Sequence, residues 1–260
     1  MLIRYPGSKD KHLKFLSKHL EASNGNIVEP FAGTASVTFY MLSQGKIDSY
    51  WINDLDESII SLWKIIKEDP NWLISKIHNY QPNTSDFYDF KTNPGVTDKE
   101  RAFRKLVLHQ ISYSGLGAMA GGPLGGRSQT GQYKVDSRWR PPKLEKLIRE
   151  TSLLLNSVSD GRLTNLGWEE VVISAQKSKK FIYLDPPYYN QGVALYVVGS
   201  LDHTRLAERL KNVSSPWVLS YDDTPEIRDL YSFAEVERLD VTSHLHHKTI
   251  GDLIIKPKSS

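Results

Sequence analysis

The chain contains no cysteine among its 260 residues, and this absence limits the chemistry available to it. No disulfide can form, and neither a cysteine nucleophile nor a cysteine-ligated zinc site can exist. Long apolar runs are also lacking, since no stretch approaches the roughly 18 residues that a membrane-spanning helix requires. Residues 1–3 are followed at once by charged positions, so we expect no signal peptide or membrane anchor. These absences favour a cytoplasmic globular protein.

The distribution of apolar residues indicates an α/β protein with an insertion. Candidate strands alternate with amphipathic helices in residues 1–56 and 162–260, which predicts a Rossmann-like, doubly wound sheet. Residues 57–161 have a mostly helical pattern, and the chain is long enough for them to form a separate inserted subdomain.

Turn residues and apolar periodicity define the expected elements. Helices are predicted over 11–22, from the glycine turn to about 44, and over 202–212, with further helices in the middle region over 98–113 and 141–156. Strands are predicted over 26–29, 50–53, 181–184, 216–221, 234–240 and 250–256.

A rigid turn, Asp185-Pro186-Pro187-Tyr188, follows the strand predicted at 181–184. The two prolines fix φ and remove two backbone donors. The Asp185 carboxylate and the neighbouring carbonyls thus form a surface of acceptors, which suits an incoming amino group. The Tyr188 ring can stack on a planar heterocycle held there, as reaction of an extruded base requires. The alternative interpretation is a proline-rich surface loop.

A second motif combines a short strand, a tight glycine turn and the start of a helix. Glu29, Pro30 and Phe31 lead to Gly33, where the missing side chain permits positive φ and lets a ligand approach the backbone. The free amides at the start of the next helix face the same crevice. The motif is typical of a cofactor-binding loop, although a simple turn glycine also fits it.

An acidic residue, Asp54, stands 21 positions after Gly33, at the end of the predicted strand 50–53. In nucleotide-binding βαβ units an acid about 20 positions after the glycine loop accepts hydrogen bonds from ribose hydroxyls. Asp54 is our candidate for this role. Its neighbour Asp56 could instead cap the helix that carries Ile59, Ile60, Trp63 and Ile66.

Together these motifs resemble those of Dam-type, adenine-specific DNA methyltransferases, which use S-adenosylmethionine. The segment from Arg4 to Lys9 resembles the family's N-terminal cofactor segment, residues 29–33 its glycine loop, and residues 185–188 its catalytic motif. The order is also similar, because in this family the target-recognition region lies between the glycine loop and the catalytic motif. Segments 111–117, 121–126 and 219–223 are similar to further family segments.

The resemblance implies direct displacement of a methyl group onto adenine N6 after base flipping. Asp185 and the Pro186 carbonyl would accept the amino hydrogens, and Tyr188 would stack on the base. Trp168 is the nearest match for a residue beside the cofactor adenine. The implied cofactor-binding residues are Tyr5, Lys9, Glu29, Pro30, Phe31, Gly33, Asp54, Trp168 and Asp185.

Positive charge is concentrated in residues 121–150. Seven Lys or Arg stand there against three Asp or Glu, whereas the rest of the chain holds 26 against 27. Basic side chains interleaved with aromatic rings suit phosphate neutralisation and base or sugar contact, although such a run is usually solvated surface. Together with the resemblance, the pattern predicts contact with duplex DNA through Arg127, Lys134, Arg138, Trp139 and Arg140.

Other functions stay open at this point. Transfer to cytosine N4 would use a similar turn, although Asp rather than Ser at position 185 disfavours it. Cytosine C5 methylation is excluded because it requires a thiolate. RNA bases and a protein glutamine are further candidate acceptors, and a catalytically silent, cofactor-sensing DNA-binding protein is the alternative from another class.

Two further expectations concern partners. His244, His246 and His247 lack a neighbouring carboxylate or cysteine that would complete a set of metal ligands, so we expect no metal. The resemblance also allows a companion restriction endonuclease.

Overall fold

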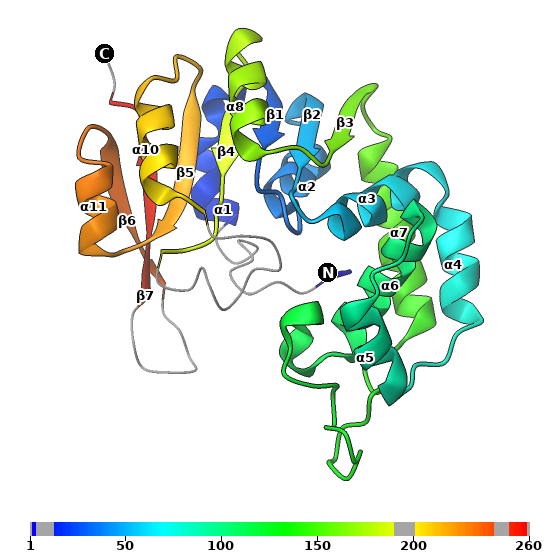
Figure 1. Ribbon diagram of the computed structural model, residues 1–260. Coiled ribbons are helices and arrows are strands. Elements are labelled where there is room, and N and C mark those ends of the chain that lie inside the picture. Colours follow the sequence, from blue (N-terminus) through cyan, green and yellow to red (C-terminus); the bar gives the residue numbers. More distant parts are fainter. Residues whose placement is uncertain (1, 4–12, 190–200, 242–249, 259–260) are drawn as a thin grey trace.

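The computed structural model describes residues 2–3, 13–189, 201–241 and 250–258 (Figure 1). Its centre is a seven-stranded mixed sheet, so the predicted α/β, Rossmann-like class is confirmed. The strands from β3 to β5 are parallel, while β7 is antiparallel to both of its neighbours. The order across the sheet is β3 (Asp160–Thr164), β2 (Ile47–Asn53), β1 (Gly25–Glu29), β4 (Ile182–Leu184), β5 (Trp217–Asp222), β7 (Ile250–Lys256) and β6 (Glu235–Val241).

All six predicted strands are confirmed, but the edge strand β3 was not predicted. The strand is partly exposed along its whole length and holds one large apolar residue, Leu163. It therefore lacks the apolar run by which the other strands were predicted. Pairing with β2 holds it in place, and the Arg162 guanidinium lies 4.0 Å from the centroid of the Trp51 ring. The predicted domain boundary between residues 161 and 162 therefore falls within a strand.

Helices cover both faces of the sheet (Figure 1). On one face lie α1 (Leu13–Leu16) and α2 (Ser36–Ser43), and on the other lie α8 (Trp168–Lys177), α10 (His203–Lys211) and α11 (Pro225–Leu230). Successive strand residues point to opposite faces. Ile27 accordingly packs in the same core as Val37 of α2, whereas Val28 packs in the second core with Val172 of α8 and Leu206 of α10.

The prediction of one continuous helix over 11–22 was wrong. In the described part of this segment, α1 is followed by two 3-10 turns, η2 (Ser17–His19) and η3 (Glu21–Ser23). Leu16 and Leu20 are fully buried, so the predicted apolar face is present although the backbone is tightened. Such 3-10 turns are common where a helix ends, and Asn24, with φ of 45°, then turns the chain into β1.

A group of helices lies beyond the β3 edge of the sheet (Figure 1). Most begin at a residue whose side chain accepts from a first-turn N–H, namely Asp56, Asp69, Asn83 or Thr97. The helices are α3 (Glu57–Glu68), α4 (Pro70–His78), α5 (Thr84–Thr92), α6 (Asp98–Ile111) and α7 (Pro141–Leu155).

An irregular segment, residues 112–140, connects α6 to α7 and projects away from the helices (Figure 1). It contains the 3-10 turns η4 (Tyr113–Gly115) and η5 (Gly117–Met119). Ala120 and Val135 of this segment pack with Phe87 of α5 and Ile111 of α6 in a small separate core. The base of the projecting segment is therefore fixed to the helices.

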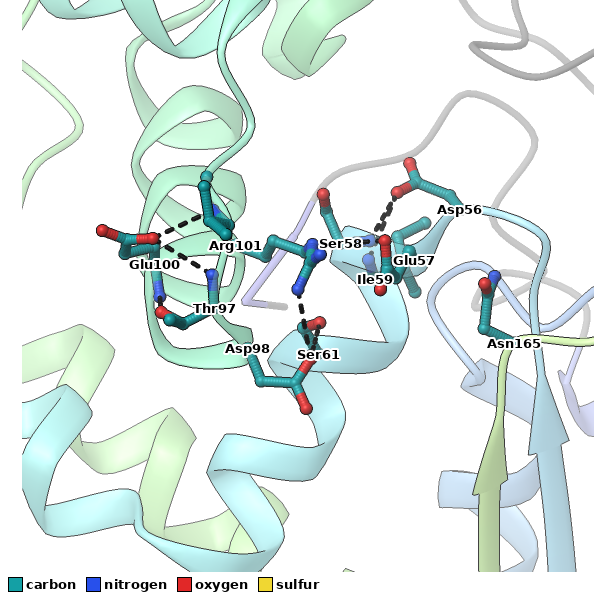
Figure 2. A network of polar contacts seen from close by, with 12 residues as sticks. Asp56, Glu57, Ser58, Ile59, Ser61, Thr97, Asp98, Glu100, Arg101 and Asn165 are labelled. Atoms are coloured by element: carbon teal, nitrogen blue, oxygen red, sulfur yellow. Dashed lines mark hydrogen bonds and ion pairs between the residues drawn. The ribbon is translucent and has the colours of Figure 1, made fainter.

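The starts of α3 and α6 face each other through a polar network, which Figure 2 shows from close by. The Ser61 hydroxyl donates to Asp98 Oδ1 at 2.6 Å. Arg101 Nε lies 3.2 Å from Glu57 Oε2, and its Nη1 lies 3.7 Å from Asp98 Oδ1. These contacts join two helices that are neighbours in space but separated by α4 and α5 in the chain.

A buried ion pair completes this junction. Lys105 Nζ of α6 lies 2.7 Å from Asp56 Oδ2, and the two side chains are only 7% and 13% exposed. Burial alone would raise the pKa of Asp56, but the Lys105 charge and the N–H donors of Ser58 and Ile59 hold it below its usual value. The helical region is thus anchored two residues after Asp54.

Two properties of the described residues bear on the predicted partners. Within the described ranges, no helix combines the length and the apolar character needed to cross a bilayer. The same residues contain no group of three or more His, Asp or Glu side chains that could hold a metal ion. His244, His246 and His247 lie outside the described residues.

Candidate active site

The candidate active site lies where the strand order reverses. β1 has β2 on one side and β4 on the other, so the chain proceeds in opposite directions from this point. In open α/β sheets, ligands bind in the crevice outside the carboxyl ends of the strands at such a switch point. Glu29 ends β1, Asn53 ends β2 and Asp185 directly follows β4. The fold therefore brings the glycine loop and the Asp185 turn to one edge of the sheet.

Hydrogen bonds on two sides fix the backbone of the glycine loop. The Gly33 N–H donates to Asp54 Oδ2 at 2.7 Å, and the Gly33 carbonyl accepts from the Trp63 indole N–H at 3.2 Å. Gly33 has a φ of 49°, which explains the need for glycine. A Cβ placed there would meet no atom of the described residues within 4 Å, so the loop is open on this side.

The carboxylate of Asp54 closes the glycine loop. Besides Gly33, it accepts from the Asp56 N–H, through Oδ1 at 2.9 Å. Burial raises its pKa to about 6, with a smaller contribution from the Asp56 charge. Each carboxylate oxygen can accept a second hydrogen bond, so these contacts leave room for a bond from a ribose hydroxyl. The ribose contact itself remains a prediction. Asp56 is confirmed as the cap of α3, since it accepts from the Ser58 N–H at 2.9 Å.

Glu29 is buried beneath the same loop, with 2% of its surface exposed. Its Oε1 accepts from the Thr38 N–H at 2.6 Å and from the Thr38 hydroxyl at 2.5 Å, which ties β1 to the first turn of α2. Burial raises its pKa to about 7, against the effect of the Thr38 bonds, and the charge of Asp185 adds to the rise. The Asp185 carboxylate thus lies close enough to influence the pKa of Glu29.

Asn53 is a residue of this site that the sequence analysis missed. Its side chain is fully buried and donates from Nδ2 to the carbonyls of Pro30 and Leu166, both at 3.0 Å. Its Oδ1 accepts from the Thr164 hydroxyl at 2.8 Å and from the Leu166 N–H at 2.9 Å. One amide therefore joins the glycine loop to the segment after β3. A polar residue ending the apolar run 50–52 was the available signal.

Phe31 and Trp168, both predicted to bind cofactor, form one aromatic surface. Their ring centroids lie 6.1 Å apart with an interplanar angle of 28°, and both side chains are partly exposed. Trp168 is the first residue of α8, and Asn165 holds the loop before it by donating to the carbonyls of Asp54 and Leu55 at 2.8 and 2.9 Å. The two rings therefore stand beside the glycine loop.

In the Asp185 turn, Asp185 is partly exposed and Pro186 is buried. Tyr188 is 9% exposed, its ring centroid lies 6.2 Å from that of Tyr221, and its hydroxyl donates to Asp252 Oδ2 at 3.0 Å. Burial, together with the charges of Asp185 and Asp252, raises the pKa of Tyr188 far above its usual range, so the hydroxyl stays protonated. Stacking of Tyr188 on a base remains a prediction.

The residue after the turn, Tyr189, is also held. Its backbone N–H donates to Asp222 Oδ1 at 3.1 Å, and its ring is 41% exposed and lies edge-on to the His203 ring, with centroids 5.2 Å apart. Burial lowers the pKa of His203, with the Asp222 charge acting in the opposite direction. Asp222 lies in the segment 219–223 that resembles a family motif, whereas Asp252 had no signal in the sequence.

The predicted DNA-binding residues lie in or next to the projecting segment. Arg127, Lys134 and Arg140 are exposed. Arg138 is partly buried and donates from Nη1 to the Ser112 carbonyl at 3.2 Å.

Trp139 is engaged within the helical region. Its indole N–H donates to the Tyr80 carbonyl at 3.1 Å, and the Tyr80 ring lies edge-on to it, with centroids 5.4 Å apart. These contacts give it a packing role, and its contact with DNA remains a prediction. Tyr5 and Lys9, predicted to line the cofactor pocket, lie outside the described residues.

A profile of the D12 class N6 adenine-specific DNA methyltransferases matches residues 5–245. The chain belongs to this family. The predicted activity, site-specific methylation of adenine in DNA, is therefore confirmed. The family assignment also selects adenine N6 over the alternative of cytosine N4.

Curated relatives of this D12 class enzyme are type II methyltransferases. The type II methyltransferase M.MjaIII of Methanocaldococcus jannaschii is 26% identical over 208 residues, which cover 72% of this chain and 68% of the relative. The type II methyltransferase M1.LlaDCHI of Lactococcus lactis subsp. cremoris is 25% identical, covering 92% of this chain and 87% of the relative. M.CviBI of Paramecium bursaria Chlorella virus NC1A is 21% identical, covering 97% and 95%.

Proposed function

We propose that this D12 class enzyme transfers the methyl group of S-adenosylmethionine to adenine N6 in duplex DNA, with the Asp185 turn as the site that receives the amino group. The observation that carries this proposal is the convergence of the glycine loop and the Asp185 turn at the switch point of the sheet. The Asp185 charge contributes to the raised pKa of Glu29, which supports the closeness of the glycine loop and the Asp185 turn.

The residues at this edge fit the proposed cofactor. S-adenosylmethionine carries positive charge on its sulfonium and ammonium groups, and Glu29, Asp54 and Asp185 place carboxyl groups at the ends of three neighbouring strands. The Phe31 and Trp168 rings offer an apolar surface for its adenine. The open side of Gly33 leaves the backbone accessible to a ligand, and Pro30 is positioned by Asn53 in the same loop. When bound, the cofactor supplies an electrophilic methyl group.

The protein's own part in the reaction is to prepare the nitrogen. Adenine N6 is a poor nucleophile because its lone pair is delocalised into the ring. The Asp185 carboxylate and the Pro186 carbonyl can accept its two hydrogens, which favours a more pyramidal nitrogen with a localised lone pair. Direct displacement of this kind needs no nucleophile from the protein, in agreement with a chain that has no cysteine. The base must leave the duplex to reach these acceptors.

Among the residues that the structure describes, the projecting segment is well suited to hold DNA. Arg127 and Lys134 are exposed there, and Tyr113 and Tyr133 expose 64% and 63% of their surface. Arg140 follows at the start of α7. Cations neutralise phosphates while exposed aromatic rings contact sugars or bases. We therefore place the duplex against residues 112–140.

The biological setting is proposed from the relatives and the substrate. Three relatives are named as type II methyltransferases, which supports a role in restriction-modification beside a companion restriction endonuclease. Because the substrate is DNA, we place the enzyme in the cytoplasm with the DNA that it modifies.

Product analysis tests the proposal. Unmethylated duplex DNA is incubated with the protein and methyl-labelled S-adenosylmethionine, and the nucleosides are then separated by mass spectrometry. Labelled N6-methyldeoxyadenosine is expected. Labelled N4-methyldeoxycytidine, or no labelled nucleoside at all, would contradict the proposal.

A further inference from the structure

Two aspartates on neighbouring strands hold the end of the Asp185 turn. Asp222 is the last residue of β5 and is paired directly with Asp252 of β7 in the antiparallel ladder. Asp222 accepts from the Tyr189 N–H at 3.1 Å, and Asp252 accepts from the Tyr188 hydroxyl at 3.0 Å. The last residue of the turn and the residue that follows it are therefore bound by one cross-strand pair.

This arrangement is unfavourable for the sheet by itself. Directly opposed residues of an antiparallel ladder have their side chains on the same face, about 5 Å apart at Cβ, and like charges there destabilise the pairing. The repulsion between the two carboxylates is offset by two donors, the Tyr188 hydroxyl and the Tyr189 N–H. The hydrogen bonds that the pair makes to Tyr188 and Tyr189 therefore explain its presence better than any contribution to the stability of the sheet.

The turn needs support at this end. Its two prolines make it internally rigid, so its direction is set by the segments on either side. Before it, β4 pairs with β1 and β5, which fixes Leu184. After it, Tyr188 and Tyr189 are hydrogen-bonded to the two aspartates, and their rings contact those of Tyr221 and His203.

We propose that Asp222 and Asp252 are positioning residues for methyl transfer, which orient the Asp185 turn by binding Tyr189 and Tyr188. This inference rests on the proposed role of Asp185 as acceptor for the adenine amino group. The two aspartates act through the turn and do not touch the substrate. Reacting groups must be held closely, since a displacement of about 1 Å can lower a rate about a hundredfold.

The test compares single-turnover rates of methyl transfer at saturating cofactor and DNA. Asp252→Ala and Tyr188→Phe each remove one side of the same hydrogen bond, and we expect each to lower the rate by roughly tenfold to a hundredfold. Dissociation constants for cofactor and DNA should change by less than about twofold. Asp252→Asn keeps an acceptor oxygen and should recover most of the rate, which a general loss of packing would not allow.

The double variant distinguishes a shared contact from two separate effects. If Asp252 and Tyr188 act through one hydrogen bond, Asp252→Ala combined with Tyr188→Phe should be no slower than the slower single variant. The matched control is Tyr231→Phe, because Tyr231 is buried in the same aromatic cluster and its hydroxyl has no hydrogen-bond partner among the described residues. This control should keep the wild-type rate. Asp222→Ala and Asp222→Asn test the other aspartate in the same way.

Rates within twofold of wild type for folded Asp252→Ala and Tyr188→Phe would overturn the inference, as would losses that multiply in the double variant. If Asp252→Ala does not fold, Tyr188→Phe decides, since it removes one oxygen and keeps the ring. Failure of the proposed function can be distinguished from failure of this inference. In that case the wild-type protein would form no N6-methyladenine in the same assay.

Discussion

The Gly33 N–H donates a hydrogen bond of 2.7 Å to the carboxylate of Asp54, which stands 21 residues later in the chain. The second oxygen of Asp54 accepts from the Asp56 N–H, at the point where α3 begins. An acid in the position expected for ribose binding therefore also sets the shape of the glycine loop. The proposed ribose contact is compatible with these bonds, because a carboxylate has more acceptor positions than the two bonds use.

Asp54→Ala should weaken cofactor binding strongly. The substitution removes the acceptor for Gly33 and the proposed contact to ribose, and a hydrogen bond to a charged group contributes about 1.5–3 kcal/mol. We expect the dissociation constant, measured by isothermal titration calorimetry, to rise at least tenfold. Asp48→Ala, an exposed acid of the same strand, is the control and should bind normally. Wild-type affinity of folded Asp54→Ala would contradict this role.

Glu29 should make the protein less stable as pH rises. Its pKa is raised from 4.5 to about 7, so between these values the native state binds more protons than the unfolded state. The free energy of unfolding therefore falls with increasing pH across this window, by about 3 kcal/mol in total. Above about pH 7 the loss persists, but ionisation of Glu29 causes no further change with pH. Urea unfolding at pH 4.5, 6 and 7.5 measures it.

Glu29→Gln is the matched variant for this measurement. It keeps an oxygen that can accept from Thr38 but has no proton to lose. Its stability should decline less than that of the wild type between pH 4.5 and 7. Equal slopes for the two proteins would show that Glu29 ionises in the native state as it does in the unfolded chain.

The buried ion pair of Lys105 and Asp56 should matter far more than an exposed pair of equal length. Lys105→Met leaves the Asp56 charge without its buried partner and should cost about 3–5 kcal/mol of stability. Lys99 of the same helix lies 2.7 Å from Asp69, but those side chains are 46% and 41% exposed. Lys99→Met should therefore have little effect. Similar midpoints of urea unfolding for the two variants would contradict this distinction.

DNA binding should depend on salt through the projecting segment. The double variant Arg127→Ala, Arg140→Ala removes two exposed cations, and the slope of log affinity against log salt should become shallower by about 0.9 for each phosphate that is no longer neutralised. Fluorescence anisotropy of a labelled duplex at several salt concentrations gives the slope. Lys177→Ala, an exposed lysine at the far end of α8, is the control. An unchanged slope in the double variant would place the DNA on another surface.

The central strands and the polar residues that follow them were predictable from sequence because burial forces apolar runs. Strands β4 and β5 are buried throughout, and Asp185 follows the first of them directly. The edge strand β3 lacked such a run because its side chains are partly exposed. What could not be predicted were partners distant in sequence, such as Tyr188 with Asp252, 64 residues apart. A hydrogen bond of this kind leaves no periodic pattern.

Contacts within one segment were partly predictable as well. Asp56 was expected to cap a helix and does so, because an N-cap acts on N–H groups two and three residues away. Trp139 shows the opposite case. Its basic neighbours predict contact with DNA, which remains a prediction, and they gave no sign that its indole N–H donates to the Tyr80 carbonyl, 59 residues before it. A run of charge does not reveal the packing partners of the aromatic residues within it.

The central claim is that the Asp185 carboxylate accepts the adenine amino group and so makes methyl transfer possible. The most direct measurement is single-turnover methylation by Asp185→Ala, with cofactor and DNA binding measured on the same preparation. We predict that labelled N6-methyladenine falls by at least a hundredfold while the variant still folds and binds DNA. A wild-type rate in the folded variant would contradict the account.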